Sequence, residues 1–145
     1  MILLSWVLAL ILWAIAALHA YWGLGGLWPA SDAISLTRTV VGVRNLKHMP
    51  TLTTCLLVAA ILAAVGSWPL FATGQLPDIW PENLVTIGGL AATAVFLARG
   101  VAAYLPSWRR HFPEEPFASN DRRYYGPLCL ALGAGFVLLL AKGQL

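Results

Sequence analysis

Long runs of apolar residues alternate with shorter polar connections along this chain of 145 residues. A membrane span takes about 20 mostly apolar residues, and four runs meet that need: residues 2–24, 52–71, 84–105 and 124–141. Ala, Leu and Gly dominate the runs, and no alternation with a period of two persists, which favours helices over strands. The pattern predicts an all-α four-transmembrane-helix bundle that forms a single integral membrane domain over residues 1–145.

Composition supports a membrane location. Hydrophobic residues make up 59% of the chain and charged residues only 10%, whereas soluble domains carry about 25% charged residues. The formal net charge is +3, a sign that also suits nucleic acid. Seven tryptophans and long uncharged stretches do not suit it, so nucleic acid is not expected as a partner and membrane lipids are.

The first apolar run has an alternative interpretation as a cleaved signal peptide. The stretch "AIAA" at residues 14–17 offers a small-x-small cleavage pattern. However, no Lys or Arg precedes the run, and the apolar residues continue past that pattern. We therefore expect a retained helix.

The three connections between the spans differ sharply in charge. The second connection, residues 72–83, holds no Lys or Arg, only Asp78 and Glu82. Basic residues gather in the first and third connections, 25–50 and 106–123: Arg38, Arg44, Lys47, Arg109, Arg110, Arg122 and Arg123. Cytoplasmic loops carry an excess of Lys and Arg. The sequence therefore predicts two cytoplasmic loops, the first and third connections, with both termini on the outer side.

Residues 25–50 form the longest segment outside the spans. Apolar residues in 33–43 recur at helical spacing after Ser31 or Asp32, either of which suits an N-cap. This favours a short helix lying on the membrane. The β-branched stretch "TVVGV" leaves an extended conformation as the alternative.

The start of the fourth span reads "DRRYYGP". Arg122 and Arg123 suit the level of anionic headgroups, and Tyr124 and Tyr125 suit the aromatic belt. Pro127 suits the first turn of a helix, where its missing N–H costs little. The stretch therefore predicts an interfacial anchor followed by a helix start.

One polar or polarizable residue lies at a similar depth in each span, near the predicted cytoplasmic face: His19, Cys55, Arg99 and Cys129. Simpler roles exist for all of them. Arg99 has a stem long enough to snorkel, His19 suits a hydrogen-bonded histidine between helices, and both cysteines suit small buried positions. No metal site is expected, and the sequence identifies no cofactor.

Arg99 is the only charge well inside a span, and all six acidic residues lie in connections. A proton-coupled transporter usually needs a carboxylate at mid-membrane, so this class is disfavoured. The counter-charge for Arg99 is Asp121, Asp32, a lipid phosphate or an anionic ligand. We predict that Arg99 points into the bundle and contacts the 121–125 segment or His19. Asp121 is the nearest acid by depth, and a bidentate pair with it would tie the third span to the start of the fourth.

Three stretches resemble a family of small bacterial membrane proteins, domain of unknown function 3995: "LHAYWGLGGLWP" at 18–29, "ARG" at 98–100 and "PFASNDRRYYGPLCLALGAGF" at 116–136. The resemblance covers nearly the whole chain and implies four spans in a bacterial inner membrane. Many members have Ser where this chain has Gly126, so a hydroxyl there is not expected to be essential. The resemblance implies no activity, substrate or cofactor.

The residues typical of this family coincide with the polar layer, which points to a defined network at the cytoplasmic mouth. The candidate ligand-binding residues are His19, Trp22, Arg99, Asp121, Arg122, Arg123 and Tyr125.

Three functions compete. The first is binding of an amphipathic anionic ligand or lipid, because guanidinium groups suit phosphate and carboxylate. The second is a membrane enzyme acting on a lipid or quinone-like substrate, with His19 as acid/base. The third is a non-catalytic accessory subunit, and the sequence leaves open a homo-oligomer or a membrane partner protein.

Overall fold

Long helices dominate the computed structural model, which describes residues 1–143. Four helical runs in this range are long and apolar enough to cross a membrane: α1 (Ile2–Gly23), α3 (Leu52–Ala72), α4 (Glu82–Ala102) and the continuous run Phe117–Lys142. Three elements make up this last run: α6 (Phe117–Asn120), the π-helical turn η1 (Asp121–Tyr125) and α7 (Gly126–Gly143). The residues described contain no strand. The prediction of an all-α chain with four apolar spans is confirmed.

Most of each span is apolar surface that the protein itself does not cover. In an apolar stretch of 18 residues, only 28% is buried in α1 and only 22% in α4. Large apolar side chains such as Leu3, Leu57 and Val95 point outward. A water-soluble monomer rarely exposes such extensive apolar surface, so hydrocarbon is the solvent that fits this exterior.

The fourth span begins earlier than the sequence pattern predicts. The helix starts at Phe117 and not near Tyr124, so the prediction that Pro127 lies in its first turn is wrong. Proline lacks the N–H of a regular helix and its ring crowds the carbonyl four residues before it. In η1 the N–H of Gly126 donates to the carbonyl of Asp121, five residues back. This widened turn directly precedes Pro127, and the helix continues through it.

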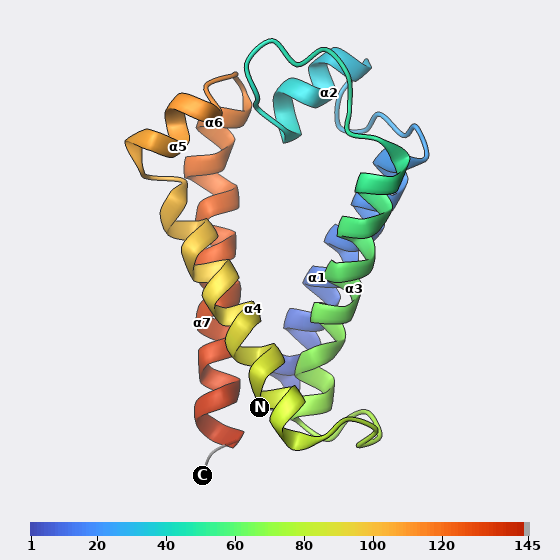
Figure 1. The fold of residues 1–145 in the computed structure, drawn as a ribbon, viewed down its shortest axis with the longest axis vertical. Helices are drawn as coiled ribbons and strands as arrows, with labels where there is room; N and C mark the ends of the chain where they lie inside the picture. The colour runs from blue at the N-terminus through green and yellow to red at the C-terminus, as the bar shows by residue number, and fades with distance from the viewer. Residues whose placement is uncertain (144–145) are drawn as a thin grey trace.

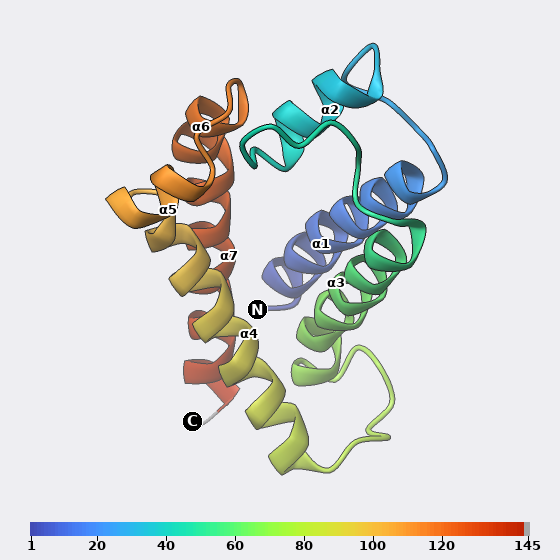
Figure 2. The same cartoon turned by 45° about the horizontal axis from the view of Figure 1, so that its top comes forward.

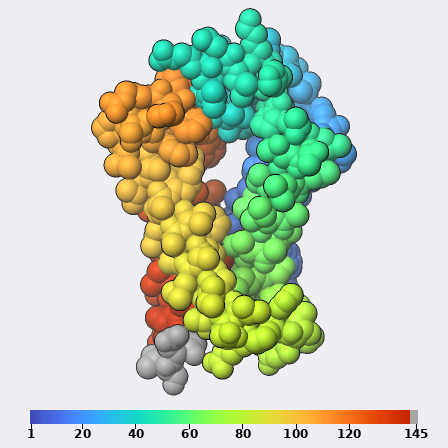
Figure 3. All heavy atoms as spheres, in the orientation of Figure 1, coloured from blue at the N-terminus to red at the C-terminus, as the bar shows by residue number. Residues whose placement is uncertain are grey.

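The four spans are arranged as two pairs. Helix α1 packs along α3, and α4 packs along α7 (Figure 1). The pairs meet near the end of the molecule that carries Met1 and residues 73–81, which we call the terminal end. They diverge toward the opposite end, which carries α2 (Ala33–Val40), α5 (Pro106–His111) and α6 and which we call the α2 end (Figure 2). An opening between the pairs is visible below α2 (Figure 3).

The buried cluster that joins the pairs lies toward the terminal end. Its members come from all four spans: Leu8, Leu12, Trp68, Ala92, Leu132, Phe136 and Leu139. The Trp68 ring stacks on Phe136 with centroids 5.0 Å apart, and its indole N–H donates to the carbonyl of Val85. Trp68 thereby connects α3 to α7 and to α4.

Helix α2 confirms the predicted short helix and its cap. The side chain of Asp32 accepts hydrogen bonds from the backbone N–H groups of Ser35 at 2.9 Å and Ile34 at 3.0 Å. These bonds, the one from the Ser35 N–H first, favour the charged form and lower the pKa of Asp32. The extended alternative is wrong for residues 33–40; the helix ends before Gly42, whose φ is +73°.

Helix α2 is tied to the second helix pair although the chain places it between α1 and α3. Arg38 Nε lies 3.4 Å from a carboxylate oxygen of Glu114. The backbone N–H of Glu114 donates to the carbonyl of Gly42 at 3.3 Å. The hydroxyl of Tyr125 donates to the carbonyl of Thr39, also at 3.3 Å. These contacts hold α2 over the opening between the pairs.

Substitutions at two adjacent glycines of α4 test the packing of Trp68 at the point where the two helix pairs meet. A Cβ added at Gly89 would overlap the Trp68 ring, whereas one added at Gly88 would lie 3.4 Å from its nearest neighbour, Trp68 Cδ1. We expect Gly89→Ala to lower stability by about 1–3 kcal/mol, the usual range for overpacking. Gly88→Ala is the control and leaves stability equal or higher, because alanine favours helix. Melting temperatures in detergent measure both, and equal values would contradict this crossing.

Candidate functional site

The arginine inside the third span forms an ion pair with the acid that begins η1. Arg99 Nη2 donates to Asp121 Oδ1 at 2.5 Å. Asp121 is only 2% exposed, and a buried carboxylate needs a partner to remain charged. The pair therefore neutralises the charge that Arg99 carries within α4.

Small residues bring the two helices close enough for this pair. A Cβ at Gly100 would lie 3.0 Å from the carbonyl oxygen of Gly126 and 2.6 Å from Leu130 Cγ. A Cβ at Gly126 would lie 2.8 Å from the Cβ of Ala103. Close backbone approach between membrane helices depends on such residues. The close approach of the two helices therefore explains why position 100, next to Arg99, is a glycine.

Trp108 is a member of this site that the sequence analysis missed. From α5, its indole N–H donates to Asp121 Oδ2 at 3.0 Å, and its ring centroid lies 4.7 Å from Arg99 Cζ. Each carboxylate oxygen of Asp121 thus serves a different partner. The predicted bidentate geometry is wrong, although the predicted pairing of Arg99 with Asp121 is present.

The guanidinium of Arg99 keeps one donor without an acceptor. Its Nη1 atom is buried and has no hydrogen-bond partner among the residues described. Buried donors of this kind are uncommon in folded proteins. Asp121 thus balances the charge of Arg99, but the Nη1 donor has no acceptor among the residues described.

The two arginines that follow Asp121 are exposed. Together with Tyr104 and Ser119, Arg122 and Arg123 line an open depression of about 440 Å³. The Tyr104 hydroxyl donates to the carbonyl of Arg122 at 3.1 Å, which fixes the rim of the depression. Neither arginine forms an ion pair within residues 1–143.

Tyr124 and Tyr125 have different environments. Tyr124 is 55% exposed, and Arg123 Cζ lies 5.6 Å from its ring centroid. Tyr125 is half-buried, with its ring centroid 5.8 Å from that of Phe117 and its hydroxyl bonded to α2. Tyr125 is therefore a contact between η1 and α2 and not a free headgroup anchor.

His19 and Trp22 lie on the other helix pair. His19 Nδ1–H donates to the carbonyl of Ile15 at 2.8 Å, and its ring meets Trp22 edge-on at 5.2 Å. Trp22 donates to the carbonyl of Trp28 at 2.7 Å. In the described range, no hydrogen bond or aromatic contact joins either residue to Arg99 or to Asp121. The structure thus brings five of the seven predicted residues to one region and leaves these two apart.

No three His, Cys, Asp or Glu side chains gather in a metal-binding arrangement within residues 1–143. Both cysteines are free; Cys55 is buried in α3 and Cys129 is half-buried in α7. The four members of the predicted polar layer are therefore divided between the two helix pairs.

Fold and site together define a helical protein with four apolar spans and a polar, arginine-rich end. The chain belongs to the family described as "Protein of unknown function (DUF3995)", which matches residues 12–136. The resemblance identified from the sequence is confirmed. Neither the curated proteins nor the solved structures gave a match to this chain.

A double-mutant cycle measures the coupling energy between Arg99 and Asp121. We expect Arg99→Gln and Asp121→Asn each to lower stability, because each leaves the other partner's charge in an apolar environment. The coupling energy between them is expected to be about 2 kcal/mol or more. Thermal unfolding of all four proteins in one detergent gives the coupling.

The matched control is the cycle of Arg38→Gln with Glu114→Gln, the other ion pair between residues 1 and 143. Its side chains are 51% and 25% exposed, and exposed pairs couple by about 0.2–1 kcal/mol. A coupling for Arg99 and Asp121 no larger than that of the control would mean that Arg99 snorkels to the surface.

Proposed function

We propose that the protein binds an amphipathic ligand with an anionic headgroup at the α2 end, where Arg122 and Arg123 receive the headgroup. The ligand class is a membrane lipid or isoprenoid phosphate, or a carboxylate of similar shape. Planar guanidinium groups are well matched to phosphate and carboxylate oxygens.

One observation carries this proposal: Arg99 has an acidic partner, whereas the nearby Arg122 and Arg123 form no ion pair within residues 1–143. The charge of Arg99 is compensated by Asp121, so Asp121 is not available to Arg122 or Arg123. These two side chains are exposed and line the same depression as Tyr104 and Ser119, whose hydroxyls donate to the carbonyl of Arg122 and to the carboxylate of Glu115. An anionic group seated there would meet two cations.

The membrane setting supports an amphipathic ligand over a soluble anion. The depression lies where the Phe117–Lys142 run begins and α4 ends. Apolar side chains of these helices, such as Val101 and Leu128, are exposed. A ligand with an apolar tail gains burial along these helices while its headgroup contacts the arginines.

The proposal includes an orientation and a location. Loops one and three carry seven of the nine basic residues of the chain, and the structure has α2, α5 and α6 together at one end (Figure 1). By the positive-inside rule this end faces the cytoplasm and both termini face outward. A bacterial inner membrane, in which the protein is multi-pass, is the location that the family resemblance suggests.

The enzyme alternative has less support. It needs His19 as acid/base and Arg99 as a clamp on one substrate, yet these residues belong to different helix pairs. Nδ1 of His19 is engaged with Ile15, and within residues 1–143 no hydrogen bond joins its ring to a Ser, Thr or Cys side chain. The accessory-subunit alternative would be favoured by a stoichiometric membrane partner in pull-down experiments.

Binding of anionic lipid tests the proposal directly. We expect Arg122→Gln combined with Arg123→Gln to weaken binding of phosphatidylglycerol about 30-fold, since each basic residue near a headgroup contributes about 1 kcal/mol. Binding of phosphatidylcholine should change little. Native mass spectrometry of the detergent-purified protein, titrated with each lipid, measures both.

The control variant combines Arg109→Gln with Arg110→Gln, which removes the same charge from α5 at the same end of the molecule. Its phosphatidylglycerol affinity should fall by much less. If both double variants lose the same affinity, the arginines act through overall surface charge, and the proposed headgroup site does not exist.

Orientation is tested by labelling single cysteines in intact cells. Ser107, in α5, and Gln75, in the loop that precedes α4, are both exposed. In a background with Cys55→Ala and Cys129→Ala, an impermeant thiol reagent should label Gln75→Cys and not Ser107→Cys. The reverse pattern would place the arginine-rich end outside.

A further inference from the structure

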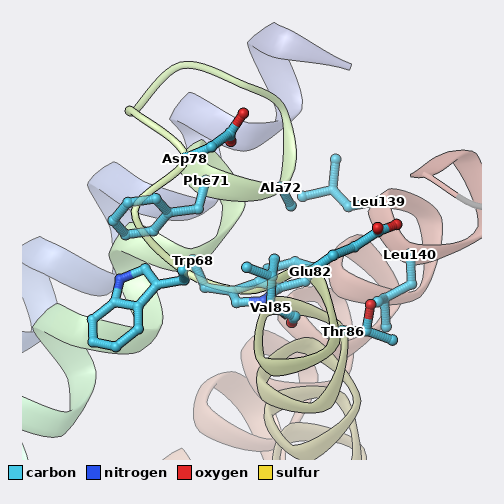
Figure 4. A pocket seen from close by; sticks show the side chains of 10 residues that line it. Trp68, Phe71, Ala72, Asp78, Glu82, Val85, Thr86, Leu139 and Leu140 are labelled. Atoms are coloured by element: carbon cyan, nitrogen blue, oxygen red, sulfur yellow. The ribbon is translucent and has the colours of Figure 1, made fainter.

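A second cavity lies at the terminal end, far along the helices from the arginines. Its volume is about 430 Å³, which falls in the range of small-molecule sites. It is enclosed by α3, by the loop that leads into α4, by the first turns of α4 and by the last turns of α7 (Figure 4).

Aromatic rings form one wall of this cavity. Trp68 and Phe71 come from α3, and Trp80 comes from the loop. Trp68 is only 8% exposed and its indole N–H is bonded to Val85, so its ring is held in place before any ligand arrives. Trp80 also lines the cavity and is 55% exposed, so its ring is accessible to a bound molecule.

The charges of the cavity are of one sign. Asp78 and Glu82 both line it, and no Lys, Arg or His does. Within residues 1–143, neither carboxylate takes part in an ion pair or a side-chain hydrogen bond. Glu82 extends toward Leu139 and Leu140, with Thr86 beside them, while Asp78 lies on the loop (Figure 4). Both acids are exposed, so they can meet a cation that enters the cavity.

We propose that this cavity binds an organic cation with apolar substituents, such as a quaternary ammonium or phosphonium ion. Aromatic faces attract such cations, most strongly when water is excluded, and the two carboxylates balance the positive charge. A bare metal ion fits less well, because indole and phenyl rings offer it no ligands and the two carboxylates lie on different walls.

This site is independent of the headgroup site proposed above. It lies at the opposite end of the spans, has the opposite charge and uses no residue of η1 or α5. Glu82 has a simpler role available, since an acid in the first turn of α4 stabilises the helix by its dipole. The experiment must therefore separate ligand binding from stability.

The probe is tetraphenylphosphonium, with tetraphenylborate as an ion of the same shape and opposite charge. Equilibrium dialysis of the full-length protein in detergent, with the same detergent on both sides, should give saturable binding of the phosphonium. The borate should neither bind with comparable affinity nor displace it. Equal affinity for the two ions would show that only apolar partitioning operates and would overturn the proposal.

Three variants locate the site. Glu82→Gln and Asp78→Asn keep side-chain shape and remove charge, and each should weaken phosphonium binding about tenfold or more. Trp80→Leu, which keeps an apolar side chain but removes the aromatic face, should also weaken it. Glu115→Gln, an exposed acid at the α2 end, should leave the affinity unchanged.

Stability and the headgroup site are measured in the same variants. If Glu82→Gln lowers the melting temperature but leaves phosphonium affinity intact, the acid serves only the helix and the proposal is wrong. Loss of phosphonium binding with unchanged phosphatidylglycerol binding assigns the effect to this cavity. The Arg122→Gln and Arg123→Gln double variant should show the reverse behaviour, so failure of either proposal is visible separately.

Discussion

The crossing of the two helix pairs at Trp68 fixes the geometry of the rest of the molecule. In a bilayer, apolar side chains gain little by leaving lipid for protein, so helix association depends on close packing and on hydrogen bonds. Trp68 supplies both, through its stacking on Phe136 and its bond to Val85. Glycine at position 89 leaves the space that the ring occupies. Because this contact lies toward the terminal end, the pairs diverge on the other side of it.

Divergence of the pairs explains why the two ends differ in character. At the terminal end, α3, α4 and α7 come together and enclose an aromatic cavity. At the α2 end the pairs are apart, and α2 connects them through Arg38, Thr39 and Gly42. The ion pair of Arg99 and Asp121 at that end lies within the α4–α7 pair of helices, and each residue compensates the charge of the other.

Features that depend on one residue at a time were predictable from the sequence. Transfer of apolar side chains into lipid is a local property, so the four spans followed from hydropathy. A cap at Ser31 or Asp32 followed from the hydrogen-bonding chemistry of short polar side chains before a helix, and Asp32 is the residue that forms it. Pairing of Arg99 with Asp121 followed from the cost of an uncompensated charge at that depth.

Features that depend on lateral placement were not predictable in this way. His19 has a similar depth to Arg99, but depth along a helix says nothing about which helix pair it belongs to. Trp108 reaches Asp121 only because a new helix begins at Pro106 and turns back toward the span. Pro127 did not locate the helix start, because a proline after a polar stretch suits a helix start and a π-helical turn equally well.

That π-helical turn has a consequence for the phase of the longest helix. A turn closed by bonds across five residues holds one residue more than regular α-helix would. If the same residues were wound as regular α-helix, with none removed, everything upstream would be rotated by about 100° relative to α7. Asp121 would then face away from Arg99, and Phe117 would leave its place under Gly42. The extra residue thus sets the angular register between the membrane-spanning half of this helix and the segment that carries its charges.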